Sequence, residues 1–297
     1  MSATGTEMKN EQPRQAEAKQ GAFTHPRDYL GNRFAYLTVS PRARGLSIGL
    51  NLNPDKRCNF DCVYCEVDRR FRGGTAAIDL DVLAAELEAM LRLVHDGTLR
   101  ESPAYAPLPP DLLQLRQVAI SGDGEPTLCP QFREAVETIV HVRAISRHGF
   151  FKIVLITNAS NLDAPQVQDG LRRLTREDEI WAKLEAGTQE QMNRINKPAV
   201  PLEKVMANIL VVARQRPVVI QSLFPSLNGA GPTELEIEEY ARRLKELRVA
   251  GAQIAAVQIC SATRPILNPN CIHLPLRTLS RIAQVVRNKT GLNVGVF

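Results

Sequence analysis

Cys58-Asn59-Phe60-Asp61-Cys62-Val63-Tyr64-Cys65 places three cysteines within eight residues, at the spacing C-x3-C-x2-C. Two residues between cysteines let a tight turn aim both sulfurs at one centre, so this spacing predicts a metal site. Three thiols are one fewer than a closed zinc or four-iron site needs, and no further Cys or His pair lies nearby in the sequence. A metal held by three protein ligands with one vacant position is typical of a site that does chemistry.

The composition predicts one sizeable α/β domain in the cytoplasm. The chain has 297 residues, 44% of them apolar, which is within the range of a single α/β barrel. No apolar run approaches the ~20 residues that cross a bilayer, and the polar N-terminus lacks the apolar core of a secretion signal. Three clustered and three scattered cysteines do not form a disulfide-like pattern, which favours a reducing compartment.

The chain carries a small excess of positive charge. Lys and Arg exceed Asp and Glu by 37 − 32 = 5. This excess is compatible with RNA or another anionic partner. An even spread of basic side chains over the surface gives the same number, so the charge alone does not identify a partner.

Alternating strand and helix patterns organise the chain. Residues 1–24 are polar and predict a disordered tail, and residues 25–297 carry the α/β pattern with a short C-terminal extension. Strands are predicted at residues 46–52, 117–121, 151–157, 179–184, 217–224 and 255–260, with a short final strand at 292–297. Helices are predicted at residues 79–94, 131–145, after Pro165, 202–214, 233–249 and 275–289. Six such units predict a parallel sheet with right-handed crossovers that is too short to close an eight-stranded barrel.

The cysteine motif after a strand resembles the signature of the radical S-adenosylmethionine (SAM) enzymes. The closer resemblance is to a subgroup of Fe-S oxidoreductases related to the wyosine tRNA-modification enzymes. It covers roughly residues 30 to 265 and rests on the cysteine motif and three further stretches: Leu46-Ser47-Ile48-Gly49, Ser121-Gly122-Asp123-Gly124-Glu125-Pro126-Thr127 and Lys183-Leu184-Glu185-Ala186-Gly187-Thr188.

This resemblance implies a fold, two cofactors and a reaction. The fold would be α/β, a partial (β/α)6 TIM-like barrel of the radical SAM type. Cys58, Cys62 and Cys65 would hold a [4Fe-4S] cluster, SAM would chelate its fourth iron, and Tyr64 would border the adenine. Reductive cleavage of SAM would give a 5′-deoxyadenosyl radical that abstracts hydrogen from a substrate, with tRNA as one candidate. A flavodoxin or ferredoxin would supply the electron.

Polar residues at strand ends are the remaining site candidates. The resemblance implies that Gly122, Asp123, Gly124 and Glu125 hold the SAM ammonium; glycines let the backbone approach a ligand closely, and a carboxylate suits a cation. An ordinary strand-to-helix turn is the alternative. Asn158 and Ser160 are candidates for the SAM ribose or carboxylate, with helix capping as the alternative for their neighbours.

Two basic residues are expected to act on SAM or the substrate. Lys183 and Glu185 lie on the same side of their strand, so Lys183 faces either the site or a surface ion pair with Glu185. The resemblance implies that Arg264, after the strand at 255–260, lies near the adenine. Residues 193–198 predict a polar basic loop over the barrel mouth.

A non-catalytic reading stays open at this stage: an iron-sulfur or zinc-binding module, or an electron-transfer module. An electron-transfer cluster is normally fully ligated, and no fourth cysteine is well placed here. Cys129, Cys260 and Cys271 are dispersed and read as buried apolar residues, although Cys271 near His273 is a candidate thiol.

Overall fold

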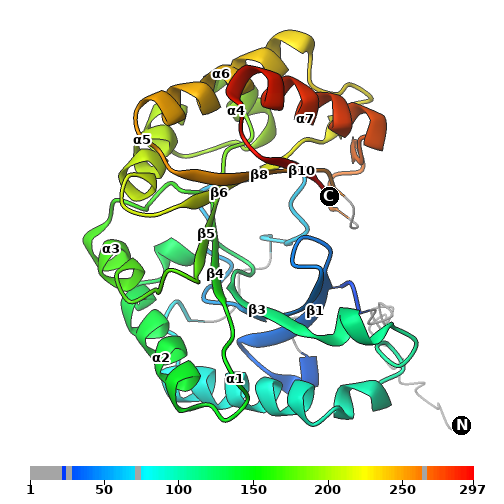
Figure 1. The fold of residues 1–297 in the computed structure, drawn as a ribbon, viewed down its shortest axis with the longest axis vertical. Helices are drawn as coiled ribbons and strands as arrows, with labels where there is room; N and C mark the ends of the chain where they lie inside the picture. Colours follow the sequence, from blue (N-terminus) through cyan, green and yellow to red (C-terminus); the bar gives the residue numbers. More distant parts are fainter. Residues whose placement is uncertain (1–21, 25–28, 71–74, 263–265) are drawn as a thin grey trace, which may run out of the picture.

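The computed structural model describes residues 22–24, 29–70, 75–262 and 266–297. Residues 1–21 of the tail predicted at residues 1–24, and the candidate Arg264, lie outside this part of the chain. Within it, one sheet of eight strands has the order β1-β2-β3-β4-β5-β6-β8-β10. β1 pairs antiparallel with β2, and all other neighbours in this sheet are parallel. The sheet curls into an open barrel with helices along its outer face (Figure 1).

The elements follow one another as strand and helix. The strands of the large sheet are β1 (Ala35–Ser40), β2 (Gly45–Leu50), β3 (Leu115–Ile120), β4 (Ile153–Thr157), β5 (Glu179–Lys183), β6 (Val218–Leu223), β8 (Ile254–Cys260) and β10 (Val294–Val296). The α-helices are α1 (Leu80–His95), α2 (Phe132–Ile145), α3 (Pro165–Leu171), α4 (Gln189–Ile195), α5 (Leu202–Ala213), α6 (Glu234–Val249) and α7 (Leu276–Thr290). Two short strands, β7 (Ser226–Leu227) and β9 (Cys271–Ile272), pair separately.

The six predicted strand-helix units and the partial barrel are confirmed. In the described residues, each of the strands β2, β3, β4, β5, β6 and β8 is followed by a helix that returns the chain to the next parallel strand. Two-sided burial explains the continuous apolar character of these strands, because helices cover one face while the other lines the barrel. β2, for example, is buried along its whole length.

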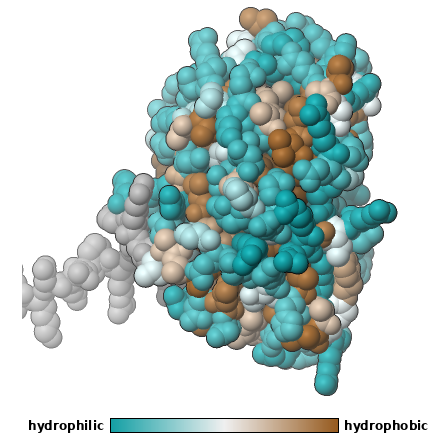
Figure 2. Space-filling model, turned by 90° about the vertical axis from the view of Figure 1, so that its left-hand side faces the viewer, coloured by the Kyte–Doolittle hydropathy of each residue, from teal (hydrophilic) through white to brown (hydrophobic). Residues whose placement is uncertain are grey.

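The helices bury one face and expose the other. Leu83, Leu87, Met90 and Leu91 form the buried stripe of α1, at the spacing that predicted this helix. Figure 2, which views the side of α3 and α5, shows a mainly hydrophilic surface with small scattered apolar patches. No helix in the described residues has both the length and the apolar character that crossing a bilayer requires.

The sequence prediction missed β1 and misassigned part of α4. Residues 35–40 form an antiparallel edge strand where only a packed lead-in was expected, and the carbonyl of Ala22 accepts a hydrogen bond from the Val39 amide. The loop predicted at residues 193–198 is wrong over residues 193–195, which end α4. The helix starts because the Thr188 hydroxyl accepts a hydrogen bond from the Gln191 amide, a cap that the polar sequence concealed.

Candidate functional site

The three cysteines lie on a loop that follows β2 at the carboxyl end of the barrel strands, where barrel enzymes place their active sites. Backbone hydrogen bonds hold this loop against residues 195–199. The amides of Asp61 and Val63 donate to the carbonyls of Asn196 and Ile195, at 3.1 and 2.9 Å. The Ala199 amide donates to the Asn59 carbonyl at 2.9 Å. The cysteine loop is therefore paired, through irregular backbone hydrogen bonds, with a segment more than 130 residues away in the sequence.

Each cysteine sulfur has an N–H group directed at it. Cys58 Sγ lies 3.5 Å from the Phe60 amide, and Cys62 Sγ lies 3.5 Å from Asn196 Nδ2. Arg69 Nη1 lies 3.0 Å from Cys65 Sγ. Burial raises the pKa of Cys62 to about 12 and also raises that of Cys58, so these two thiols are protonated at neutral pH. A coordinating metal would deprotonate them, and these donors would then stabilise the thiolates.

Three cysteine thiols, each with an N–H partner, are the kind of donor set that an iron-sulfur cluster uses. Among the described residues, no three Cys, His, Asp or Glu side chains are grouped as ligands of one metal ion. In an iron-sulfur cluster each cysteine binds a different iron, so the sulfurs need not converge on one point. The donor set of three thiols with N–H partners therefore suits a [4Fe-4S] cluster.

The structure brings most of the predicted site residues to one cavity. Cys58, Cys62 and Cys65 share it with the following predicted residues: Tyr64, Gly122, Gly124, Glu125, Asn158 and Lys183. We call it the cysteine cavity. Asp123 and Ser160 do not line it. Asp123 accepts a hydrogen bond from Asn51 Nδ2 at 2.8 Å, so its side chain helps to fix the loop after β3.

Gly122 and Gly124 allow close packing of two loops. A Cβ atom on Gly124 would lie 2.1 Å from the Arg57 carbonyl oxygen, and one on Gly122 would lie 2.4 Å from Asn51 Oδ1. Neither distance is sterically permitted. Both glycines are therefore needed to seat the loop after β3 against the segment that leads into the cysteines.

Glu125 is buried and already bonded within the chain. Its Oε1 accepts hydrogen bonds from the Thr127 amide at 3.1 Å, the Thr127 hydroxyl at 2.7 Å and the Thr157 hydroxyl at 2.5 Å. Its Oε2 accepts from the Asn158 amide at 2.7 Å. Burial raises the pKa of Glu125, although these four donors favour its ionised form. Glu125 thus ties the ends of β3 and β4 together, and only Oε2 keeps room for a further donor.

Asn158 and Ser160 orient the cysteine loop through Asn59. Asn158 Nδ2 donates to Asn59 Oδ1 at 2.9 Å, and Asn59 Nδ2 donates to the Ser160 hydroxyl at 2.9 Å. The Ser160 hydroxyl also lies 3.2 Å from Asn59 Oδ1. Asn59 had no special role in the sequence prediction, although it lies inside the cysteine motif.

Lys183 and Glu185 both contact Tyr64, in agreement with the prediction that they share one side. Lys183 Nζ lies 5.5 Å from the centre of the Tyr64 ring. The Tyr64 hydroxyl and Asn196 Nδ2 both donate to Glu185 Oε2. Burial opposes the charge of Lys183, but Glu185 and the cysteines outweigh it and raise the Lys183 pKa. Of the two alternatives for Lys183, the structure has it lining the cysteine cavity, and the described residues show no Lys183–Glu185 salt bridge at the surface.

Four residues of the site were not predicted: Arg42, Asn59, Arg69 and Asn196. Arg69 Nη2 donates to the Asp123 carbonyl at 3.1 Å, so this guanidinium links the cysteine loop to the loop after β3. A basic residue four positions after the last cysteine was the available signal for Arg69. Arg42 comes from a distant segment that no local pattern marks, and Asn196 lies in the stretch predicted over the barrel mouth.

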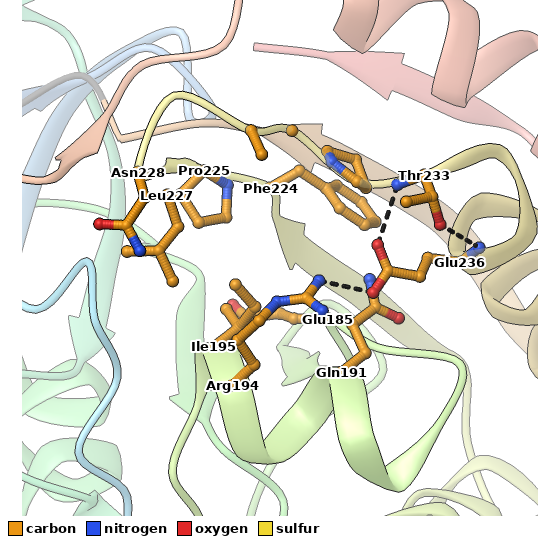
Figure 3. A pocket seen from close by; sticks show the side chains of 13 residues that line it. Glu185, Gln191, Arg194, Ile195, Phe224, Pro225, Leu227, Asn228, Thr233 and Glu236 are labelled. Carbon is orange, nitrogen blue, oxygen red and sulfur yellow. Dashed lines mark hydrogen bonds and ion pairs between the residues drawn. The ribbon is translucent and has the colours of Figure 1, made fainter.

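A second cavity lies beside the first, on the other side of the Tyr64–Glu185 pair. It has a volume of about 300 Å³, and we call it the side cavity. Figure 3 shows Phe224, Pro225 and Leu227 on one side of it, and Ile195 of α4 on the other. Glu185 also lines it, and Glu185 Oε1 is buried without a hydrogen-bond partner. The Arg194–Glu236 ion pair lies at its edge.

Comparisons with solved structures identify the fold. Streptococcus suis SuiB bound to S-adenosylmethionine aligns over 86% of this chain with a TM-score of 0.57 and 15% identity. TYW1 with a lysine-pyruvate adduct aligns over 87% of this chain and 85% of its own, with a TM-score of 0.55 and 14% identity. Both are radical SAM enzymes. The chain has the radical SAM barrel fold. It spans about half of SuiB, 52% of that chain.

Sequence relatives carry a family name without an activity. A UPF0026 protein of Helicobacter pylori is 23% identical over 266 residues, which is 84% of this chain and 78% of the relative. A UPF0026 protein of Synechocystis is 29% identical over 177 residues, which is 59% of this chain and 57% of the relative. No family model matches the chain. The names of these relatives give no substrate.

Proposed function

We propose that this protein is a radical SAM enzyme. The observation that carries the proposal is the cysteine cavity: three sulfurs, each with an N–H donor, at the carboxyl end of a barrel with the fold of SAM-bound SuiB. Cys58, Cys62 and Cys65 would hold a [4Fe-4S] cluster. Bound together and reduced, the cluster and SAM supply a 5′-deoxyadenosyl radical that removes a hydrogen atom from the substrate.

The chain's own residues would bind and orient SAM. The backbone at Gly122, Asp123 and Gly124, together with Glu125 Oε2, would bind its ammonium. Arg69 and Lys183 are cations facing the same cavity and would balance its carboxylate and the thiolates. Asn158 and Ser160 would act mainly by holding Asn59, and hence the cysteine loop, in place. Arg264 stays a prediction for the adenine end.

The side cavity would take the adenine. Its apolar walls of Ile195, Phe224 and Leu227 suit a flat aromatic ring. The partnerless Glu185 Oε1 could accept a hydrogen bond from an exocyclic amino group, and Tyr64 stands between the two cavities. This arrangement would place the nucleoside and methionine ends of SAM on opposite sides of Tyr64.

A one-electron donor such as a flavodoxin or ferredoxin would reduce the cluster in the cytoplasm. An RNA substrate is supported only by the net charge of +5 and by the likeness to TYW1. The non-catalytic zinc module is not favoured, because the described side chains include no group of single-ion ligands.

Anaerobic reconstitution tests the proposal. With iron and sulfide, the protein should turn brown and bind about four iron atoms per chain. After reduction with dithionite in the presence of SAM, it should release 5′-deoxyadenosine, measured by mass spectrometry. Cys129→Ala is the matched control, because Cys129 is a buried core residue outside the cysteine motif, and its replacement should leave the iron content unchanged. A colourless protein that retains zinc, or a loaded cluster that never cleaves SAM, would overturn the proposal.

A further inference from the structure

Arg42 reaches across the open side of the barrel into the cysteine cavity. It lies in the turn between β1 and β2, yet its Nη1 is 3.9 Å from the sulfur of Cys260, the last residue of β8. Strands of a curled sheet are tilted and staggered, so the start of β2 can lie opposite the end of β8. The guanidinium therefore forms part of the cavity wall on the side of β8.

The charge of Arg42 is not neutralised by the chain. Among the described residues, no carboxylate lies within ion-pair distance of its guanidinium, and its Nε is buried without a hydrogen-bond partner. Within the described part of the chain, its one hydrogen-bond partner is the weak acceptor sulfur of Cys260. An arginine keeps its charge inside proteins, and a partly buried charge costs free energy unless it is paired. The Arg42 guanidinium is thus able to bind an anionic ligand that is not part of the chain.

The other two cationic side chains that line the cavity, Arg69 and Lys183, lie at the cysteine motif. Arg69 donates to Cys65 Sγ and to the Asp123 carbonyl, and it faces the cysteine loop. Lys183 lies over Tyr64 and acts on the thiols of Cys58, Cys62 and Cys65. Arg42 instead contacts Cys260, which belongs to another strand and is no part of the cysteine motif. Under the proposed function, Arg69 and Lys183 would therefore balance the thiolates and the SAM carboxylate without Arg42.

Besides the carboxylates of Glu66 and Glu125, the cavity that Arg42 lines carries uncharged polar side chains. The Tyr36 and Ser121 hydroxyls lie 2.9 Å apart, and Gln221 Nε2 lies 3.4 Å from Gln258 Oε1. Tyr36, Ser121 and Gln221 all line the cavity. Hydroxyl and amide groups can orient a polar ligand without opposing a negative charge.

We propose that Arg42 binds an anionic group of the substrate, a carboxylate or a phosphate. This inference rests on the proposed function, because Arg42 shares its cavity with the three cysteines. A planar guanidinium holds such a group through two parallel N–H bonds, which fixes orientation as well as position. Arg42 is thereby a specificity-determining residue: it selects substrates that carry a negative charge at a set distance from the hydrogen to be removed.

Anion titration of the reconstituted, SAM-bound protein tests this inference. Inorganic phosphate and acetate serve as probes in separate calorimetric titrations at low salt. Wild type should bind one anion per chain, and the anion with the higher affinity identifies the class. Arg42→Gln should weaken that binding at least tenfold, whereas Arg42→Lys should lose less because it keeps the charge. Arg44→Gln, an exposed arginine in the same turn, is the matched control and should bind as wild type does.

Three results would overturn the inference. They are no anion binding by SAM-bound wild type, equal binding by Arg42→Gln, and binding that occurs in a parallel titration of SAM-free protein but not in SAM-bound protein, because the last would assign Arg42 to the SAM carboxylate. Circular dichroism checks that Arg42→Gln is folded. A protein that releases 5′-deoxyadenosine without binding either anion refutes only this inference. A protein that binds an anion through Arg42 but never cleaves SAM refutes the proposed function, and with it the substrate role of Arg42.

Discussion

Replacing Glu125 by glutamine tests whether the fold itself uses this carboxylate. The four donors around it come from Thr127, Thr157 and Asn158, and two of them are backbone amides on opposite carboxylate oxygens. A glutamine amide has one oxygen and one NH₂ group. If the nitrogen replaces Oε1 it faces the Thr127 amide, and if it replaces Oε2 it faces the Asn158 amide. Hydroxyl groups can rotate to compensate, but a backbone amide cannot.

The expected cost follows from that geometry. One buried N–H loses its acceptor in either orientation, and the other bonds lose the assistance of the charge. An unsatisfied buried donor costs about 1–3 kcal/mol, and bonds to charged groups are worth more than neutral ones. We therefore expect Glu125→Gln to lower the free energy of unfolding by about 2–4 kcal/mol. Glu88→Gln, at an exposed ion pair with Arg92 on α1, should change it by about 0.5 kcal/mol or less.

Urea unfolding of the iron-free protein measures the difference. The chain has a single tryptophan, Trp181, which is buried in β5 and therefore reports the loss of the core through its fluorescence. The loss of stability should be present before any cofactor is added, because all four donors belong to the chain. If Glu125→Gln unfolded at the same urea concentration as wild type, the structural role of the four hydrogen bonds to Glu125 would be refuted.

Three further predictions address the cysteines, the loop packing and the pH dependence of stability. Cys62→Ser should abolish the brown absorbance after reconstitution while the iron-free protein stays folded by circular dichroism; an unchanged iron content would contradict the ligand assignment. Gly124→Ala should lower SAM affinity, measured by calorimetry, at least tenfold, because its Cβ would lie 2.1 Å from the Arg57 carbonyl oxygen and push the two loops apart. An unchanged affinity would show that SAM binding does not depend on this loop packing. Burial opposes the charge of Asp178, but hydrogen bonds from Arg143 and from backbone amides outweigh it and hold its pKa below the ordinary value. Its contribution is full above pH ~4 and is lost as pH falls through the lowered pKa, so urea unfolding of Asp178→Asn and wild type should differ most at neutral pH and converge in acid.

The barrel was predictable from local patterns. The apolar stripe of α1 and the strand-helix alternation gave the six units, and Thr233 with Glu236 forms the predicted capping box at the start of α6. These features depend on residues three or four positions apart, so a single sequence contains them. β1 escaped prediction although residues 37–40 (Leu-Thr-Val-Ser) alternate between apolar and polar residues, because four residues are the shortest alternating run that indicates a strand.

The site was only partly predictable, because its support comes from distant segments. The resemblance identified the cysteines, and the structure places Lys183 beside them. Nothing near Arg42 in the sequence indicates that it would reach the cavity, since this depends on the stagger of the sheet. Asn196 lies in the stretch predicted over the barrel mouth, but its contact with Cys62 depends on where α4 ends. Contacts between side chains from such distant segments are set by how the chain folds as a whole, and no local sequence pattern contains that information.

The pairing of residues 59–63 with residues 195–199 has a consequence for cofactor assembly. Because long-range backbone bonds hold the thiols, iron-free protein should already display the loop in its receptive shape. Loading would then need little rearrangement, unlike a zinc finger that folds only around its metal. Slow amide hydrogen exchange at Val63 and Ala199 in iron-free protein would show that the loop is already folded. Iron could then leave and bind again without unfolding the protein.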